Sequence, residues 1–99
     1  SLTCVYAQAN LPTSCEGHLI GGKRFYLEIS DHFASLSFQD EFSFHDEGID
    51  LSTSSDHTYA VGFSETLGVV IEIDSQAPAH ERLSWTDEDS TTTFSCQNF

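Results

Sequence analysis

Positively charged side chains are almost absent from this sequence. Three Lys and Arg residues stand against sixteen Asp and Glu, so the formal net charge of the 99 residues is −13. The imbalance lies in residues 31–99, where fourteen acids meet only Arg82. Such a surface repels phosphate backbones and anionic lipid headgroups, so we expect no nucleic-acid partner and no binding to a membrane surface. The acids either keep the protein in solution or attract cations and basic proteins.

Methionine and long hydrophobic runs are missing as well. The longest apolar run, residues 67–71, is far shorter than the ~20 residues of a membrane-spanning helix, so no membrane span is expected. The first residues, Ser1 to Cys4, resemble a mature amino terminus left after removal of a signal peptide. A chain of 99 residues with 38% apolar content has enough material for one hydrophobic core, which predicts a single domain over 1–99. Together with the amino terminus, this predicts that the domain is secreted and extracellular.

Only three cysteines are present, Cys4, Cys15 and Cys96, which allows one disulfide and leaves one thiol. Cytosolic cysteines stay reduced, whereas small exported domains use disulfides as staples, so the cysteines favour secretion. A Cys4–Cys96 bridge closes nearly the whole chain and stabilises by ~4–5 kcal/mol in the loop-entropy model, against roughly 3 kcal/mol for Cys4–Cys15. We therefore predict Cys4–Cys96, with Cys15–Cys96 as the second choice. The remaining thiol is expected to be buried, or else to join a second chain.

Apolar residues recur at every second position almost throughout, which is typical of half-buried β-strands. Polar turns separate these stretches, and no window shows a helical stripe. The pattern predicts an all-β domain, an antiparallel β-sandwich or small barrel of about 7–8 short strands stapled by one disulfide. The alternating stretches are 25–29, 34–38, 42–44, 49–51, 59–63, 69–73, 83–85 and 94–96.

Finer expectations follow from the turn residues. Residues 23–51 predict a three- or four-stranded meander with a tight turn at Asp46-Glu47-Gly48, and residues 58–74 predict a hairpin that turns at 64–67. Residues 7–22 are the least regular and are expected to form a loop across one end of the sheets. The three Thr at 91–93 predict an edge strand open to pairing with another chain.

Clustered acids raise the question of metal binding. Calcium takes six to eight oxygen ligands, usually from a loop with alternating acids and a glycine. The acids of residues 87–89 do not match the twelve-residue calcium loop, so the sequence admits only a weak calcium site at Asp87 and Asp89, with a solvated turn as the alternative. The five His lack the paired spacing of zinc ligands. Apart from this weak calcium site, no cofactor is expected.

An enzymatic reading rests on a resemblance. The chain is similar in length, in acidity and in its terminal cysteines to small secreted guanyl-specific ribonucleases and to fungal effectors that share their fold. The resemblance implies a long helix after the amino-terminal cysteines and a hydrolase acting on RNA. The segment that follows Cys15, residues 16–22, is a poor helix former, and no G-x-S-x-G motif is present. A ribonuclease-like hydrolase therefore stands as the alternative function.

Binding is the leading hypothesis for function. Lys23, Arg24 and Tyr26 form a basic and aromatic spot in an acidic chain, and the alternation turns Tyr26 away from the core face. This spot could hold a sugar or a peptide, although a single outward Tyr is common on protein surfaces. We expect a small secreted non-enzymatic binding protein, similar in composition to fungal-type microbial virulence effectors or recognition factors. Its partner would be a host or extracellular protein or glycan, and a weak calcium- or carbohydrate-binding module is a further alternative.

Overall fold

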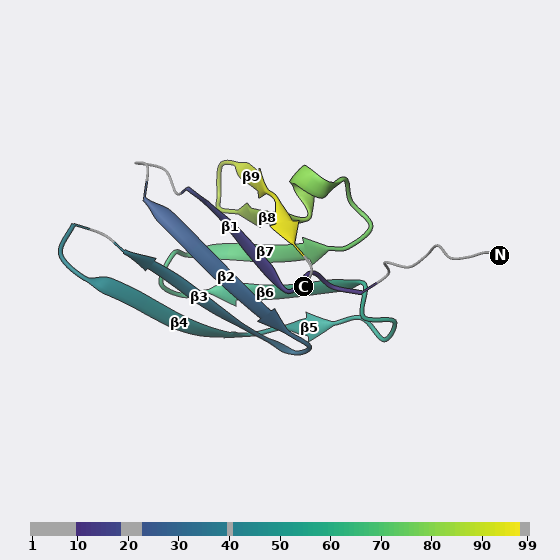
Figure 1. The fold of residues 1–99 in the computed structure, drawn as a ribbon. Helices are drawn as coiled ribbons and strands as arrows, with labels where there is room; N and C mark the ends of the chain where they lie inside the picture. Colours follow the sequence, from purple (N-terminus) through teal and green to yellow (C-terminus); the bar gives the residue numbers. More distant parts are fainter. Residues whose placement is uncertain (1–9, 19–22, 40, 98–99) are drawn as a thin grey trace.

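The structure, a computed structural model, describes residues 10–18, 23–39 and 41–97. Its strands form two five-stranded sheets with the orders β10-β1-β2-β3-β4 and β5-β6-β7-β8-β9, and Figure 1 shows them as two layers. Every neighbouring pair is antiparallel, so the predicted all-β sandwich is confirmed. The elements are β1 (Ser14–His18), β2 (Arg24–Ser30), β3 (Phe33–Gln39), β4 (Phe44–Asp50), β5 (Ser52–Thr53), β6 (Tyr59–Ser64), β7 (Val69–Asp74), the 3₁₀ helix η2 (Ala79–Glu81), β8 (Leu83–Thr86), β9 (Thr91–Phe94) and β10 (Cys96–Gln97).

The alternation of side chains builds the core between the two sheets. In β2, Phe25, Leu27 and Ile29 are buried while the residues between them are exposed. The other sheet contributes fully buried aliphatic side chains from β7 and β8. Gly62 of β6 lets the layers approach closely, because a Cβ there would lie 2.9 Å from Cγ2 of Ile49. The apolar residues of every second position therefore meet in one interior, as the period of two predicts.

Several local predictions are confirmed. Strands β2, β3 and β4 form the meander expected in residues 23–51. Strands β6 and β7 form the hairpin expected in 58–74, and Gly68, with φ of +69°, lies in its turn. The Thr-rich segment forms β9, which is the edge strand of the second sheet.

Other local predictions are wrong. The segment expected as a loop contains β1, which pairs with β2 over five residues, and the described residues include no α-helix, so the helix implied by the ribonuclease resemblance does not form there. Strand β1 escapes the hydrophobic pattern because its inward positions are Cys15 and Gly17. The turn predicted at Asp46-Glu47-Gly48 lies within β4, where these residues pair with β3. Gly48 permits a close contact there, because a Cβ would lie 2.7 Å from Cζ of Phe33.

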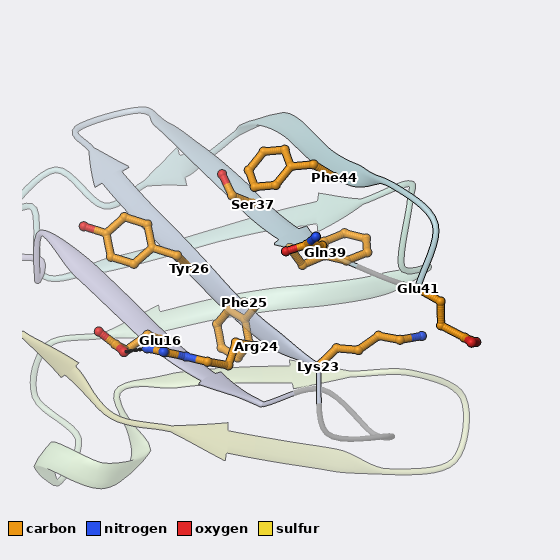
Figure 2. Close-up of a pocket in the computed structure, with 10 residues that line it drawn as sticks. Glu16, Lys23, Arg24, Phe25, Tyr26, Ser37, Gln39, Glu41 and Phe44 are labelled. Atoms are coloured by element: carbon orange, nitrogen blue, oxygen red, sulfur yellow. Dashed lines mark hydrogen bonds and ion pairs between the residues drawn. The ribbon is translucent and has the colours of Figure 1, made fainter.

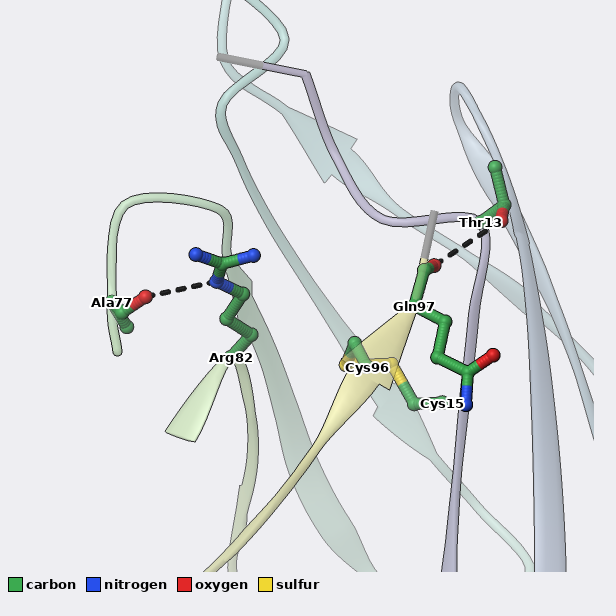
Figure 3. Close-up of a disulfide and its surroundings, with 6 residues drawn as sticks. All are labelled: Thr13, Cys15, Ala77, Arg82, Cys96 and Gln97. Carbon is green, nitrogen blue, oxygen red and sulfur yellow. Dashed lines mark hydrogen bonds between the residues drawn. A yellow bond between two sulfur atoms is a disulfide. The ribbon is translucent and has the colours of Figure 1, made fainter. Parts of the chain in front are cut away.

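The disulfide joins Cys15 to Cys96, which corrects the preferred pairing of Cys96 with Cys4 and forms the second choice instead. Cys4 lies outside the described residues. The chain leaves the second sheet after β9 and returns to the first as β10, which places Cys96 directly opposite Cys15 with Cα atoms 4.0 Å apart. Thr13 adds hydrogen bonds from its backbone N and its Oγ1 to the carbonyl oxygen of Gln97, at 2.8 and 3.2 Å (Figure 3). The bridge therefore fixes the crossing of the chain between the sheets.

One carboxylate ties the sheets together at the opposite edge. Glu47 of β4 accepts a hydrogen bond from the hydroxyl of Ser64 at 2.6 Å and from the backbone N of Glu65 at 2.9 Å. The Ser64 side chain is fully buried at the end of β6. Because a buried hydroxyl without a partner is costly, this contact stabilises the position of β4 over the turn after β6.

Candidate binding groove on the first sheet

The first sheet turns one face away from the core, and we call this its outer face. Its residues lie in register across the strands, so that Glu16 of β1, Tyr26 of β2, Ser37 of β3 and Asp46 of β4 form one row. In the neighbouring row, Gln39 pairs with Phe44. The outer face therefore combines aromatic rings with short polar side chains.

A shallow groove of about 590 Å³ lies on the outer face. Figure 2 shows Ser37 between the rings of Tyr26 and Phe44, with Lys23 and Glu41 toward one end. The three predicted ligand residues, Lys23, Arg24 and Tyr26, all line it, so the structure brings them into one site. The lining residues are Glu16, Lys23, Arg24, Phe25, Tyr26, Ser37, Phe38, Gln39, Glu41 and Phe44.

Charge in the groove is balanced, unlike charge in the whole chain. Two basic and two acidic residues line it, so its formal charge is zero. The guanidinium of Arg24 donates a hydrogen bond to Glu16 at 2.9 Å, and both side chains are exposed. An exposed ion pair of this kind contributes little to stability, generally under about 1 kcal/mol. Its effect is to hold a planar donor and an acceptor side by side along the groove.

Phe44 is the main residue of the groove that sequence reasoning missed. The ring is 66% exposed, although the pattern had grouped it with apolar residues of a strand. In β4 the inward positions are His45, Glu47 and Ile49, which places Phe44 outward. His45 takes the inward place by stacking on Phe38, with ring centroids 4.8 Å apart. The sequence does contain a signal for this orientation. If Ile49 points inward, Glu47 and His45 also point inward because side chains alternate along a strand, and Phe44 must then point outward.

Phe33 adds a third exposed ring to the outer face. Its ring lies over Gly48 of the neighbouring strand and stays 46% exposed. Standard strand spacing and rise place the Cα atoms of Tyr26 and Phe44 roughly 12 Å apart, and those of Phe33 and Phe44 roughly 20 Å apart. The three rings are therefore spread along the face instead of forming one cluster.

The second sheet presents a different outer face. Its exposed ring, Phe63, pairs across the strands with Val70, which makes a small apolar patch. The hydroxyl of Tyr59 donates a hydrogen bond to Glu72, and this contact raises the pKa of Tyr59 to about 12. On the first sheet, by contrast, no described residue hydrogen-bonds the Tyr26 hydroxyl. Of these two tyrosine hydroxyls, that of Tyr26 is therefore the one available to a ligand.

The predicted calcium ligands lie in the turn between β8 and β9. Oδ1 of Asp87 accepts hydrogen bonds from the backbone N of Asp89 at 2.8 Å and of Ser90 at 3.0 Å. These donors hold the pKa of the Asp87 carboxyl below its usual value. Within the described residues, no three His, Cys, Asp or Glu side chains gather closely enough to hold a metal ion. A calcium site at Asp87 and Asp89 stays a prediction. A melting temperature that rises when calcium is added would support the site, and an unchanged melting temperature would exclude it.

No protein-family model, characterised protein or solved structure matches the chain. Among residues 10–18, 23–39 and 41–97, no helix has the length and apolar character needed to cross a membrane. What the groove can bind is therefore argued from its own geometry.

Proposed function

We propose that this chain is a secreted, non-enzymatic binding protein and that the outer face of its first sheet binds an extended, uncharged glycan. The observation that carries the proposal is the spread of Tyr26, Phe33 and Phe44 over one sheet face with polar side chains between them. The disulfide supports secretion, because structural disulfides persist in oxidising compartments. The acidic surface outside the groove is consistent with a soluble extracellular role.

The chemistry of a sugar ring fits such a face. A pyranose has an apolar side made of C–H groups and a rim of hydroxyls, so it packs on an aromatic ring and hydrogen-bonds around it. Phe44 and Tyr26 supply the rings of the groove, while Gln39 and the Arg24–Glu16 pair supply donors and acceptors along its sides. A glycan chain of several units repeats this combination along its length, as the outer face does.

The arrangement fits a glycan better than a protein partner. Protein interfaces concentrate their aromatic anchors in a central, fully desolvated cluster. Here the three rings are separated by hydroxyl and carboxylate side chains, including Ser37 and Asp46, which would lose hydration under a protein. The groove has zero formal charge within a chain of net charge −13, so an uncharged ligand is favoured over an anionic one.

Calorimetric titration with hexasaccharides of neutral polysaccharides, such as glucans, xylans and chitin fragments, tests the proposal. We expect at least one to bind and the substitutions Tyr26→Ala and Phe44→Ala to weaken its binding about 5–30-fold, which corresponds to about 1–2 kcal/mol for a buried aromatic anchor. Phe63→Ala is the matched control, because Phe63 is 55% exposed but lies on the other sheet. Heparin is the anionic control and should not bind.

Three results would contradict the proposal. The first is the absence of binding to every neutral glycan, and the second is an equal loss from Phe63→Ala and Phe44→Ala. The third is turnover: hydrolysis of RNA or of the bound polysaccharide would remove the non-enzymatic part and favour the hydrolase alternative.

A further inference from the structure

A second cavity, of about 380 Å³, lies between the two sheets at one end of the sandwich, and we call it the inter-sheet cavity. The first sheet contributes Phe38 of β3 and His18 at the end of β1, and the second contributes residues of β7, β8 and β9. Its volume is at the lower end of the range of small-molecule sites, about 300–1,000 Å³. The lining residues are His18, Lys23, Phe38, Leu67, Val69, Trp85, Asp87, Ser90, Thr92 and Phe94.

The interior of this cavity is apolar and closely packed. Trp85, Phe38 and Val69 are all buried core residues, and Leu67 and Phe94 pack against the same core. The ring of Trp85 lies 4.7 Å from that of Phe94 and 4.5 Å from that of Phe25, measured between centroids. Mutually packed rings hold fixed positions, so the cavity offers a preformed apolar wall to a ligand.

The rim of the cavity carries the side chain of Lys23. No described residue forms an ion pair or a hydrogen bond with its ammonium group. Asp87 also lies at the rim and keeps its negative charge, and Oδ1 of its carboxylate accepts hydrogen bonds from the turn backbone at Asp89 and Ser90. A ligand anion therefore has to sit on the Lys23 side of the mouth, away from Asp87. An apolar interior with a cation at its mouth is complementary to a molecule that has an apolar body and one negative charge.

We propose that the inter-sheet cavity binds a small amphipathic acid, with its apolar body against Trp85 and its carboxylate at Lys23. At about 30 Å³ for each water-sized group, the cavity has room for roughly a dozen such groups, which suits a straight acyl chain of eight to ten carbons. Burial of each additional methylene should strengthen binding about fourfold until the cavity is full. The cavity is distinct from the groove on the outer face, although Lys23 lines both.

Trp85 is the only tryptophan of the chain, so its fluorescence reports directly on this cavity. Titration with decanoate should change the Trp85 emission, and a decanoate carrying bromine on its chain should quench it by contact. Hexanoate, octanoate and decanoate should bind with increasing affinity. Decanol, which has the same tail but no charge, should bind about tenfold or more weakly than decanoate, as expected for loss of one charge-assisted pair.

Three variants separate the parts of the proposal. Lys23→Gln should bring the affinity for decanoate down to that for decanol, and Arg82→Gln is the control that removes the same charge away from the cavity. Thr92→Phe places a ring at the mouth from β9 and should abolish binding of both probes. Circular dichroism of each variant checks that the sheets are intact.

Absence of quenching by the brominated acid in the intact protein would overturn the site. Equal binding of decanol and decanoate, or equal losses from Lys23→Gln and Arg82→Gln, would overturn the assignment of the acid. Because Lys23 also lines the groove, glycan binding is tested separately by Phe44→Ala, whose ring lines the groove and not the inter-sheet cavity.

Discussion

Removal of the Cys15–Cys96 disulfide is expected to take away a large part of the stability of this domain. The two cysteines are 81 residues apart in the sequence. A cross-link over a loop of that length lowers the entropy of the unfolded chain and stabilises the fold by about 4.5 kcal/mol at 25 °C. A domain of this size has a total free energy of unfolding of only about 5–15 kcal/mol. The double variant Cys15→Ala/Cys96→Ala should therefore lose between about a third of its free energy of unfolding and nearly all of it.

Urea unfolding measures this loss, because the free energy of unfolding extrapolates linearly to zero denaturant. The control is Cys4→Ala, which keeps the bridge and should unfold at the same urea concentration as the unmodified protein. A loss below about 1 kcal/mol in the double variant would refute the reasoning, since loop entropy alone predicts several times more.

The pairing itself can be read by mass spectrometry if the protease is chosen from the sequence. Trypsin leaves Cys4 and Cys15 on one peptide, because no Lys or Arg precedes Lys23. Chymotrypsin can cut after Tyr6, whereas Pro12 blocks cleavage after Leu11, and the cut at Tyr6 separates the two cysteines. Recovery of a peptide that links Cys96 to the Cys4 fragment would refute the pairing on which the estimate depends.

Three further predictions concern charge and packing. Glu47→Ala should lower the free energy of unfolding by about 1–3 kcal/mol, because the buried Ser64 hydroxyl loses its acceptor, whereas Glu28→Ala on the outer face should change it little in the same urea assay. Hydrogen bonds lower the pKa of Asp56 and of Asp87 in the folded state. The two ionised carboxylates therefore stabilise the fold at any pH above the ordinary carboxyl pKa, and this stabilisation is lost as the pH falls from there through the lowered pKa values. The melting temperature should thus hold from pH 7 to pH 5, where self-repulsion also eases, and fall below about pH 4; a steady fall between pH 7 and pH 5 would contradict this. Gly48→Ala should displace the Phe33 ring and so weaken glycan binding as much as Phe33→Ala does. The circular dichroism of Gly48→Ala should be unchanged. If titration finds full glycan affinity in Gly48→Ala, Phe33 is not part of the binding face.

The sequence predicts the fold best in strands that carry apolar residues on one face and polar residues on the other. In β2, Phe25, Leu27 and Ile29 alternate with polar residues, and the structure buries the three and exposes their neighbours. The same holds for Ile71 and Ile73 of β7. Burial on one face fixes which residues point inward, since a slip of one residue would reverse every side chain.

The pairing of the cysteines did not follow from sequence, because it depends on a strand that the hydrophobic pattern misses. Strand β1 buries Cys15 and has a half-buried glycine, Gly17, at its next inward position, where other strands bury large side chains. With β1 unrecognised, nothing local indicates that Cys15 lies opposite Cys96. Loop entropy favours the longer Cys4–Cys96 closure by very little, because the benefit grows only with the logarithm of loop length. Register between distant strands decided the pairing instead.

The part of the candidate site at residues 23–26 was predictable, and the part that β4 contributes was not. Lys23, Arg24 and Tyr26 adjoin in sequence, so a strand brings the two outward members of this spot to the same face without any tertiary information. Phe44 joins them from β4 through pairing of that strand with β3, and its orientation is set by the inward stacking of His45 on Phe38. His45 therefore points inward and the more apolar Phe44 points outward, an arrangement that composition alone does not predict.

The three basic residues of this protein, Lys23, Arg24 and Arg82, differ in the contacts that their side chains make. Arg82 donates a hydrogen bond to the carbonyl oxygen of Ala77 at 2.9 Å, and Arg24 pairs with Glu16. Lys23 has neither kind of contact among the described residues and lines both the groove and the inter-sheet cavity. In a chain whose overall field repels anions, an anionic group can approach favourably only where a local cation outweighs that field within a Debye length, about 8 Å in physiological salt. The response of each site to ligand charge therefore depends strongly on this one side chain.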